Sequence, residues 1–100
     1  MQRRKEVLPV IISFFQANAL LGFLKCEDLT IPAGEIKSSE FTMHIMRSRS
    51  LAYWRNTAVD LGMCKEEVDN YSERSRLFEC ILRKAADALF TDRNYQGVSL

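Results

Sequence analysis

The residues of this chain with the greatest capacity for chemistry are three cysteines and one histidine. The cysteines are Cys26, Cys64 and Cys80, and no two of them have CxxC spacing. With His44 they could form only a Cys₃His zinc site, a type that usually draws on closely spaced cysteines. The odd number instead indicates reduced thiols, packed as small apolar groups in a reducing compartment. We therefore expect no metal site, no disulfide framework and a cytoplasmic location.

The other residue types that support catalysis show no recognisable pattern. His44 has no cysteine or carboxylate at a triad-like local spacing. Glu66 and Glu67 are adjacent, so on a helix they do not face one common point. The four glycines are isolated from one another and do not form a phosphate-binding loop. We expect a protein without enzymatic activity and without a cofactor.

Residues 46–55 form a segment with three arginines, two aromatic residues and no acid. Trp, Tyr and Arg are the residue types that most often dominate the binding energy of interfaces. Arg49, Tyr53, Trp54 and Arg55 are therefore predicted to bind a partner. Two alternatives remain open, namely arginines that grip a nucleic-acid backbone and solvated arginines that pair with the acidic patch from Asp60 to Glu73, in the same chain or in a neighbour. On a helix Tyr53 and Trp54 lie about 100° apart, so one can face the core while the other faces out.

Small and apolar residues surround a glycine in the stretch from Arg55 to Tyr71. Two helices that meet at a steep angle need a small contact at the elbow, a residue that tolerates a left-handed conformation, and apolar anchors behind it. Six residues occupy such positions: Ala58, Leu61, Gly62, Met63, Val68 and Tyr71. On these residues the stretch resembles the helix-turn-helix pattern of many transcription regulators.

That resemblance implies a DNA-binding protein whose second helix enters the major groove. Lys65 and Asn70 are the residues of this helix that could contact DNA. From Asp60 to Glu73, however, five acids and one base give a net charge of −4. Such a helix repels phosphates, which dominate DNA affinity. A DNA-binding regulator is therefore the alternative, and a structural elbow is the preferred interpretation.

Length and composition restrict the class of protein further. One hundred residues suggest a single domain. Fourteen basic and 13 acidic residues give a net charge of +1, which excludes a strongly basic coat for nucleic acid. The apolar content of 47% is typical of a folded chain. We expect one helical domain over residues 1–90 and a flexible polar tail over 91–100.

The first residues resemble a secretory signal in three parts. Basic residues at positions 3–5 precede an apolar run, and Ala17-Asn18-Ala19 is similar to a cleavage site. Against cleavage, Glu6 lies in the basic part and residues 20–24 stay apolar. We therefore expect this segment to remain in the protein.

The run from Val7 to Leu24 is apolar nearly all round if it is helical. Its 18 residues are close to the lower limit of about 17 for a membrane span, but polar residues interrupt it. We expect a helix near 5–25 that does not cross a membrane. A helix without a polar face is normally surrounded by other elements, and two further helices cannot easily cover it. Val10, Phe14 and Leu21 are therefore predicted to form an oligomer interface, as in a homodimer.

Two further helices, near 39–62 and 65–90, are predicted after a connector over 26–39. Gly62 ends the first of them, as a C-terminal glycine should. Residues 40–46 also alternate between apolar and polar, which leaves a strand as an alternative there. The predicted fold is all-α, an oligomeric three-helix bundle with a helix-turn-helix-like elbow at Gly62.

These features favour a small regulatory protein that acts by protein–protein contact and not by catalysis. A neutral helical protein with an unusually apolar helix offers a surface and no visible chemistry. Antiactivators, adaptors, secretion chaperones and immunity-type proteins all fit this description. The expected partners are another protein and a second copy, with nucleic acid only in the alternative and no membrane.

Overall fold

The computed structural model describes residues 7–90, and most of them are helical. In chain order the elements are β1 (Ile11–Ile12), α1 (Phe14–Phe23), β2 (Ile36–Lys37), α2 (Ser38–Arg47), α3 (Leu51–Asp60), α4 (Lys65–Asn70) and α5 (Arg74–Leu89). The predicted helical class is confirmed, but five helices replace the predicted three and a small antiparallel sheet is added. The tail predicted over 91–100 lies outside the described residues.

The first helix is shorter than the helix predicted near 5–25, because Ser13 starts it. The Ser13 hydroxyl accepts a hydrogen bond from the backbone N–H of Gln16 at 3.0 Å, and the Gln16 side chain accepts one from the backbone N–H of Ser13 at 2.9 Å. This reciprocal capping box begins α1 at Phe14. Pro9 therefore precedes the helix and is not in its first turn. Within residues 7–90, no helix combines the length and the apolar content that a membrane crossing requires.

The two-stranded sheet brings the end of the connector between α1 and α2 next to the start of α1. β1 and β2 are antiparallel, with Ile11 opposite Lys37 and Ile12 opposite Ile36. Ile12 is 1% exposed and belongs to the core. Since α2 begins directly after β2, this short pairing determines where α2 starts relative to α1.

Residues 39–62 form two helices, so the single helix predicted there is wrong. Between α2 and α3, Ser50 has an extended backbone, and its hydroxyl accepts a hydrogen bond from the N–H of Tyr53 at 3.1 Å. Serine at this position stabilises a helix start by satisfying an otherwise unpaired backbone N–H. Residues 40–46 lie inside α2, so the strand alternative for them is also wrong.

The elbow predicted at Gly62 is confirmed. Gly62 has φ +99°, and it follows the last turn of α3. Its N–H donates to the carbonyl of Val59 at 2.9 Å, and the N–H of Met63 donates to the carbonyl of Ala58 at 3.0 Å. These two bonds form a Schellman motif, which ends a helix at a left-handed residue. The chain then turns and enters α4.

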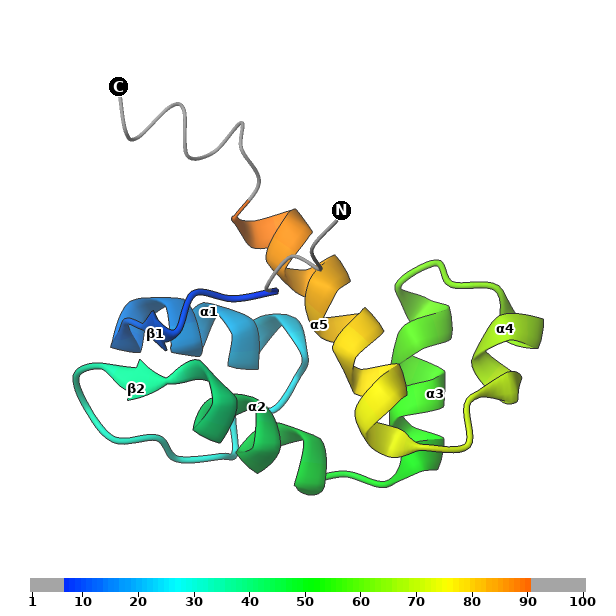
Figure 1. The fold of residues 1–100 in the computed structure, drawn as a ribbon, viewed down its shortest axis with the longest axis horizontal. Helices are drawn as coiled ribbons and strands as arrows, with labels where there is room; N and C mark the ends of the chain where they lie inside the picture. The colour runs from blue at the N-terminus through cyan, green and yellow to red at the C-terminus, as the bar shows by residue number, and fades with distance from the viewer. Residues whose placement is uncertain (1–6, 91–100) are drawn as a thin grey trace, which may run out of the picture.

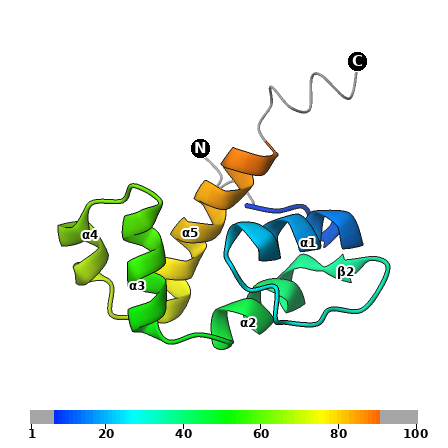
Figure 2. The ribbon, with the colours of Figure 1, turned by 180° about the vertical axis from the view of Figure 1, so that it is seen from behind.

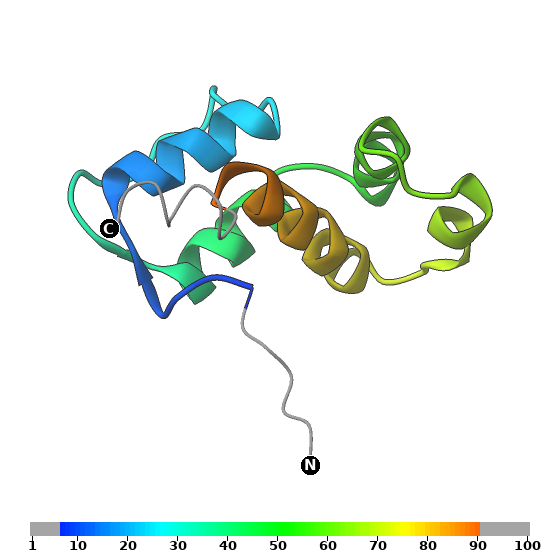
Figure 3. The ribbon, with the colours of Figure 1, turned by 90° about the horizontal axis from the view of Figure 1, so that it is seen from above.

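The longest helix, α5, runs through the middle of the molecule (Figure 1). Residues 71–73 separate it from α4, so the single helix predicted near 65–90 is divided there. The sheet, α1 and α2 lie on one side of α5, and α3 and α4 lie on the other (Figure 1, and from behind in Figure 2). Its buried residues therefore join the two halves: Leu77, Phe78, Ile81, Leu82, Ala85 and Ala86. Seen from above, α1 and α4 lie at opposite ends of the molecule (Figure 3).

We expect Gly62→Val to destabilise the protein through its backbone alone. A side chain at a left-handed φ costs about 1–2 kcal/mol, and no atom lies within 4 Å of the position that a Cβ would take. Thermal melts should show a lower Tm for Gly62→Val and a smaller decrease for Gly62→Asn, because asparagine tolerates this region better. A Gly62→Val melt identical to that of the wild type would contradict a left-handed elbow.

Candidate functional site

Arg49, the first of the predicted partner-binding residues, lies in the turn between α2 and α3 and is engaged within the chain. Its guanidinium donates to Oδ1 of Asp28 at 2.6 Å and lies over the ring of Tyr53, 5.4 Å from the ring centroid. Its backbone carbonyl accepts a hydrogen bond from Nη1 of Arg74 at 2.9 Å. Arg49 thereby ties the loop after α1 to α3 and to the start of α5.

Tyr53 and Arg55 also direct their polar atoms into the fold. The Tyr53 hydroxyl donates to the carbonyl of Leu24 at 3.4 Å, at the end of α1. Nη2 of Arg55 donates to the carbonyl of Tyr71 at 2.7 Å, in the link between α4 and α5. Both side chains are half-buried and retain part of their surface for a partner.

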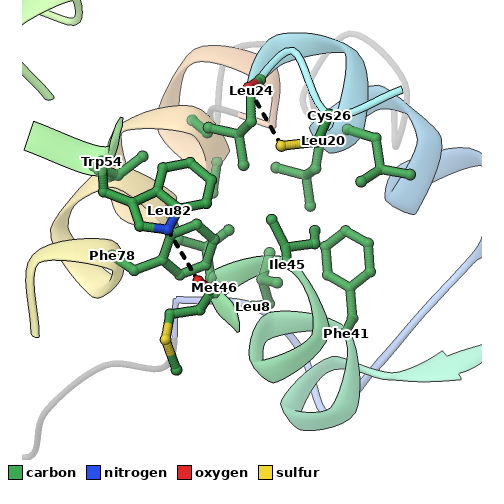
Figure 4. Packing of buried hydrophobic residues seen from close by; sticks show 14 of the residues in the cluster. Leu8, Leu20, Leu24, Cys26, Phe41, Ile45, Met46, Trp54, Phe78 and Leu82 are labelled. Atoms are coloured by element: carbon green, nitrogen blue, oxygen red, sulfur yellow. Dashed lines mark hydrogen bonds between the residues drawn. The ribbon is translucent and has the colours of Figure 1, made fainter. Parts of the chain in front are cut away.

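Trp54 lies in the core and not on the surface. Its exposed fraction is 0%, and its indole Nε1 donates to the carbonyl of Met46 at 3.0 Å. Its ring packs edge-on against Phe78 of α5, with centroids 4.7 Å apart (Figure 4). Trp54 therefore packs against the turn that contains Arg49, and its side chain is not accessible to a partner.

The residues predicted for DNA contact lie on a very short helix. Lys65 and Asn70 are exposed at the two ends of α4, which has six residues. The Lys65 ammonium is 2.8 Å from a carboxylate oxygen of Asp69, and the hydrogen bond from Lys65 lowers the pKa of Asp69. Because Glu66 and Glu67 are also exposed, this helix presents mainly negative charge to solvent.

Of the three residues predicted to form an oligomer interface, two are exposed and one is buried. Val10 is 74% exposed and Phe14 is 43% exposed, whereas Leu21 is 2% exposed and packs in the core. Leu21 is unavailable to a partner because α1 turns that face inward. Two residues that the sequence analysis did not select are exposed beside the first pair, namely Ile11 at 47% and Phe15 at 80%.

We call Val10, Ile11, Phe14 and Phe15 the N-terminal apolar patch. They fall within six consecutive residues, where β1 passes into α1 through the Ser13 cap. The Ser-x-x-Gln pattern could have located this helix start in the sequence, but it does not specify which side chains remain exposed. Once a helix begins at Phe14, the residues before its Ser13 cap are extended, and the two phenylalanines lie in its first turn.

The thiols and the imidazole do not converge on a reactive centre. Cys26 is buried, Cys64 is exposed, and the Sγ of Cys80 lies 3.2 Å from the Tyr71 hydroxyl. His44 is exposed on α2. No three or more His, Cys, Asp or Glu side chains among residues 7–90 are grouped so that they could hold a metal ion.

A hollow of about 390 Å³ opens between α2, α5 and the segment before β1. Its lining combines apolar side chains, such as Met46 and Phe78, with the hydroxyl groups of Thr42 and Ser75. The carboxylate of Glu79 also lines it and lies 3.6 Å from the guanidinium of Arg83. The hollow thus holds one carboxylate, which is paired, among apolar and hydroxyl groups.

Comparison of the chain with known protein families, with curated proteins and with solved structures finds no match.

The ion pair of Asp28 and Arg49 predicts a dependence of stability on pH. The hydrogen bond from Arg49 holds the pKa of Asp28 below its usual value. A carboxyl group with a lowered pKa in the folded state stabilises the fold above its ordinary pKa of about 4, and this contribution is lost as the pH falls through the folded-state value. Asp28→Asn should therefore lower Tm at neutral pH, and the difference from the wild type should close as the pH falls through the lowered pKa of Asp28.

Glu27→Gln is the matched control. Glu27 is the exposed carboxylate next to Asp28, and it forms no ion pair with any residue in the range 7–90. It should melt like the wild type across the same pH range. A difference between Asp28→Asn and the wild type that persists at low pH would contradict the electrostatic origin.

The thiols of Cys26 and Cys64 should differ sharply in their reactivity toward a thiol reagent. Cys26 is 0% exposed, its Sγ donates to the carbonyl of Leu24 at 3.5 Å, and burial raises its pKa (Figure 4). Because the thiolate is the reactive form, a thiol reagent should modify Cys64 in the native protein and Cys26 only after denaturation. Peptide mass spectrometry identifies the labelled sites. Labelling of Cys26 in the native protein at the rate of Cys64 would show that the end of α1 opens readily.

Proposed function

We propose that this protein is a non-enzymatic regulatory protein that acts by protein–protein contact through the N-terminal apolar patch. The exposure of Phe15 carries the proposal. An aromatic ring that is 80% exposed gains little from folding, because the hydrophobic effect rewards only the area removed from water. Burial against another protein would supply that gain.

The grouping of the exposed apolar residues supports this function. Single exposed apolar residues are ordinary on a protein surface, but contiguous patches mark interaction sites. Among residues 7–90 there are six large hydrophobic residues with substantial exposure, and four of them form the patch. The other two, Met43 and Val59, lie on different helices and are 42% and 39% exposed. Four of the six exposed large hydrophobic residues therefore lie within one stretch of six residues.

The state of the arginine-rich segment supports the same choice of surface. Arg49 and Arg55 make their shortest polar contacts within the chain, to Asp28 and to the carbonyl of Tyr71. Loss of these contacts would be a cost of any partner that recruited the two guanidinium groups. The apolar patch requires no such exchange, so it is the better docking surface.

The proposal places the protein among antiactivators, adaptors, secretion chaperones and immunity-type proteins. Members of these classes act by covering a surface on another protein, and an exposed apolar patch on a folded domain suits that role. The fold here meets the second condition through its buried core, which joins α1, α2, α3 and α5.

The test is capture of partners by the tagged full-length chain in lysate of its native cell. Phe15→Glu places a charge in the patch at a residue whose side chain is mostly exposed, so the fold should survive. We expect the captured proteins to be lost with Phe15→Glu. They should be retained with Val59→Glu, which places the same charge at an exposed valine on α3.

Circular dichroism of both variants verifies that each remains folded. Capture that is equal for the wild type and for both variants would exclude the patch as the docking surface.

A further inference from the structure

We propose that the partner of the N-terminal apolar patch is a second copy of this chain, which pairs its β1 with β1 about a twofold axis. This inference rests on the proposed function, because it uses the same patch, and a second copy competes there with any other protein that binds the patch. Three features of the structure carry it: the charge around the patch, the free edge of β1 and the area of the patch.

The patch is suited to face itself because it carries no charge. Residues 7–24 contain no Asp, Glu, Lys, Arg or His. In a twofold interface each side chain near the axis meets its own copy, so a charge there would repel itself. The acidic helix α4 lies at the other end of the molecule (Figure 3). A second copy can therefore approach without bringing like charges together at the axis.

The edge of β1 that faces away from β2 has backbone groups free for a further strand. The N–H of Ser38 donates to the carbonyl of Val10 at 2.8 Å, so Val10 and Ser38 form a hydrogen-bonded pair. Hydrogen-bonded and non-hydrogen-bonded pairs alternate along an antiparallel ladder. The next pair, Ile11 and Lys37, is therefore a non-hydrogen-bonded one, and the N–H and carbonyl of Ile11 point away from β2.

Ile11 can thus exchange two hydrogen bonds with Ile11 of a second copy. The product is a four-stranded sheet in the order β2, β1, β1, β2. Pro9 lacks an N–H on the same edge, which limits the pairing to its centre. Lys37 is the charged residue opposite Ile11, and in this sheet the two copies of Lys37 lie three strand spacings apart, about 14 Å. That separation exceeds the Debye length of about 8 Å at physiological salt, so their repulsion is screened.

The exposed area of the patch is similar to the apolar area that one partner buries in a typical dimer interface. The exposed fractions of its four residues correspond to roughly 450 Å² of surface, given about 150–250 Å² for an aromatic side chain and less for valine and isoleucine. A specific interface buries about 800 Å² on each partner, of which somewhat more than half is apolar. Full burial of the four residues therefore reaches the apolar share of such an interface.

The first measurement is the mass of the purified full-length protein by light scattering over a wide range of concentration. We expect twice the 11.6 kDa of one chain. Phe15→Glu should raise the dissociation constant by more than tenfold and give the mass of one chain. Val59→Glu should leave the dimer intact.

The second measurement tests the strand pairing, in a Cys64→Ser background that removes the exposed thiol. Cα atoms of a hydrogen-bonded antiparallel pair are about 5.5 Å apart, within the range that a disulfide spans. Ile11→Cys should therefore form a covalent dimer with oxidised glutathione, and Val59→Cys should remain a single chain. A covalent dimer through Ile11→Cys that is absent for Val59→Cys supports the proposed axis.

Three results would overturn the inference, and they separate it from the proposed function. A single-chain mass at every concentration overturns it, and so does a dimer that Phe15→Glu does not weaken or that Ile11→Cys does not cross-link. If the protein is a single chain but Phe15→Glu still abolishes capture of other proteins, the proposed function stands and its partner is a different protein. If neither mass nor capture depends on Phe15, both proposals fail.

Discussion

The burial of Trp54 is the constraint on which the rest of this structure depends. The ring lies where α2, α3 and α5 meet, and removing about 200 Å² of such a side chain from water stabilises the fold by up to about 5 kcal/mol. The indole N–H must have an acceptor in this setting, because an unpaired buried donor costs about 1–3 kcal/mol. The acceptor is the carbonyl of Met46 near the end of α2. The chain turns between α2 and α3, which brings that carbonyl to the indole N–H, and Ser50 starts the new helix there.

The contacts of Arg49 follow from that turn. With α2 and α3 turned about Trp54, the residue between them faces the loop after α1 and the first turn of α5. Its guanidinium meets Asp28 and its carbonyl meets Arg74, so one residue closes the space among three segments that are distant in sequence. Most of the polar capacity of the arginine-rich segment is used within the molecule. The same residue types that often mark an interface here stabilise the tertiary structure.

The N-terminal apolar patch consists of apolar residues that the core does not bury. A single α5 can cover one face of α1, and Ala17, Leu20 and Leu21 occupy that face. The aromatic pair at the helix start and the two aliphatic residues before it lie beyond the reach of α5, so they remain in water. The excess of apolar residues at the N-terminus, visible in the sequence, thus becomes a localised surface. Its position at one end of the molecule, opposite the acidic α4, gives the protein an apolar end and a negatively charged end (Figure 3).

The sequence by itself determined the features that depend on near neighbours along the chain. The helical class follows from apolar spacing, and the elbow at Gly62 follows from a glycine after an apolar stripe, since both depend on backbone geometry within a few residues. Long-range contacts decided the rest. The helix breaks at Ser50 and at 71–73 interrupt stretches whose periodicity suits a continuous helix, and they persist because Trp54 and α5 gain more from packing than the helices lose. The tertiary structure also decided which predicted binding residues face solvent. Trp54 and Leu21 are inside and Phe15 is outside, because exposure depends on which elements pack together, and residue type alone does not specify that.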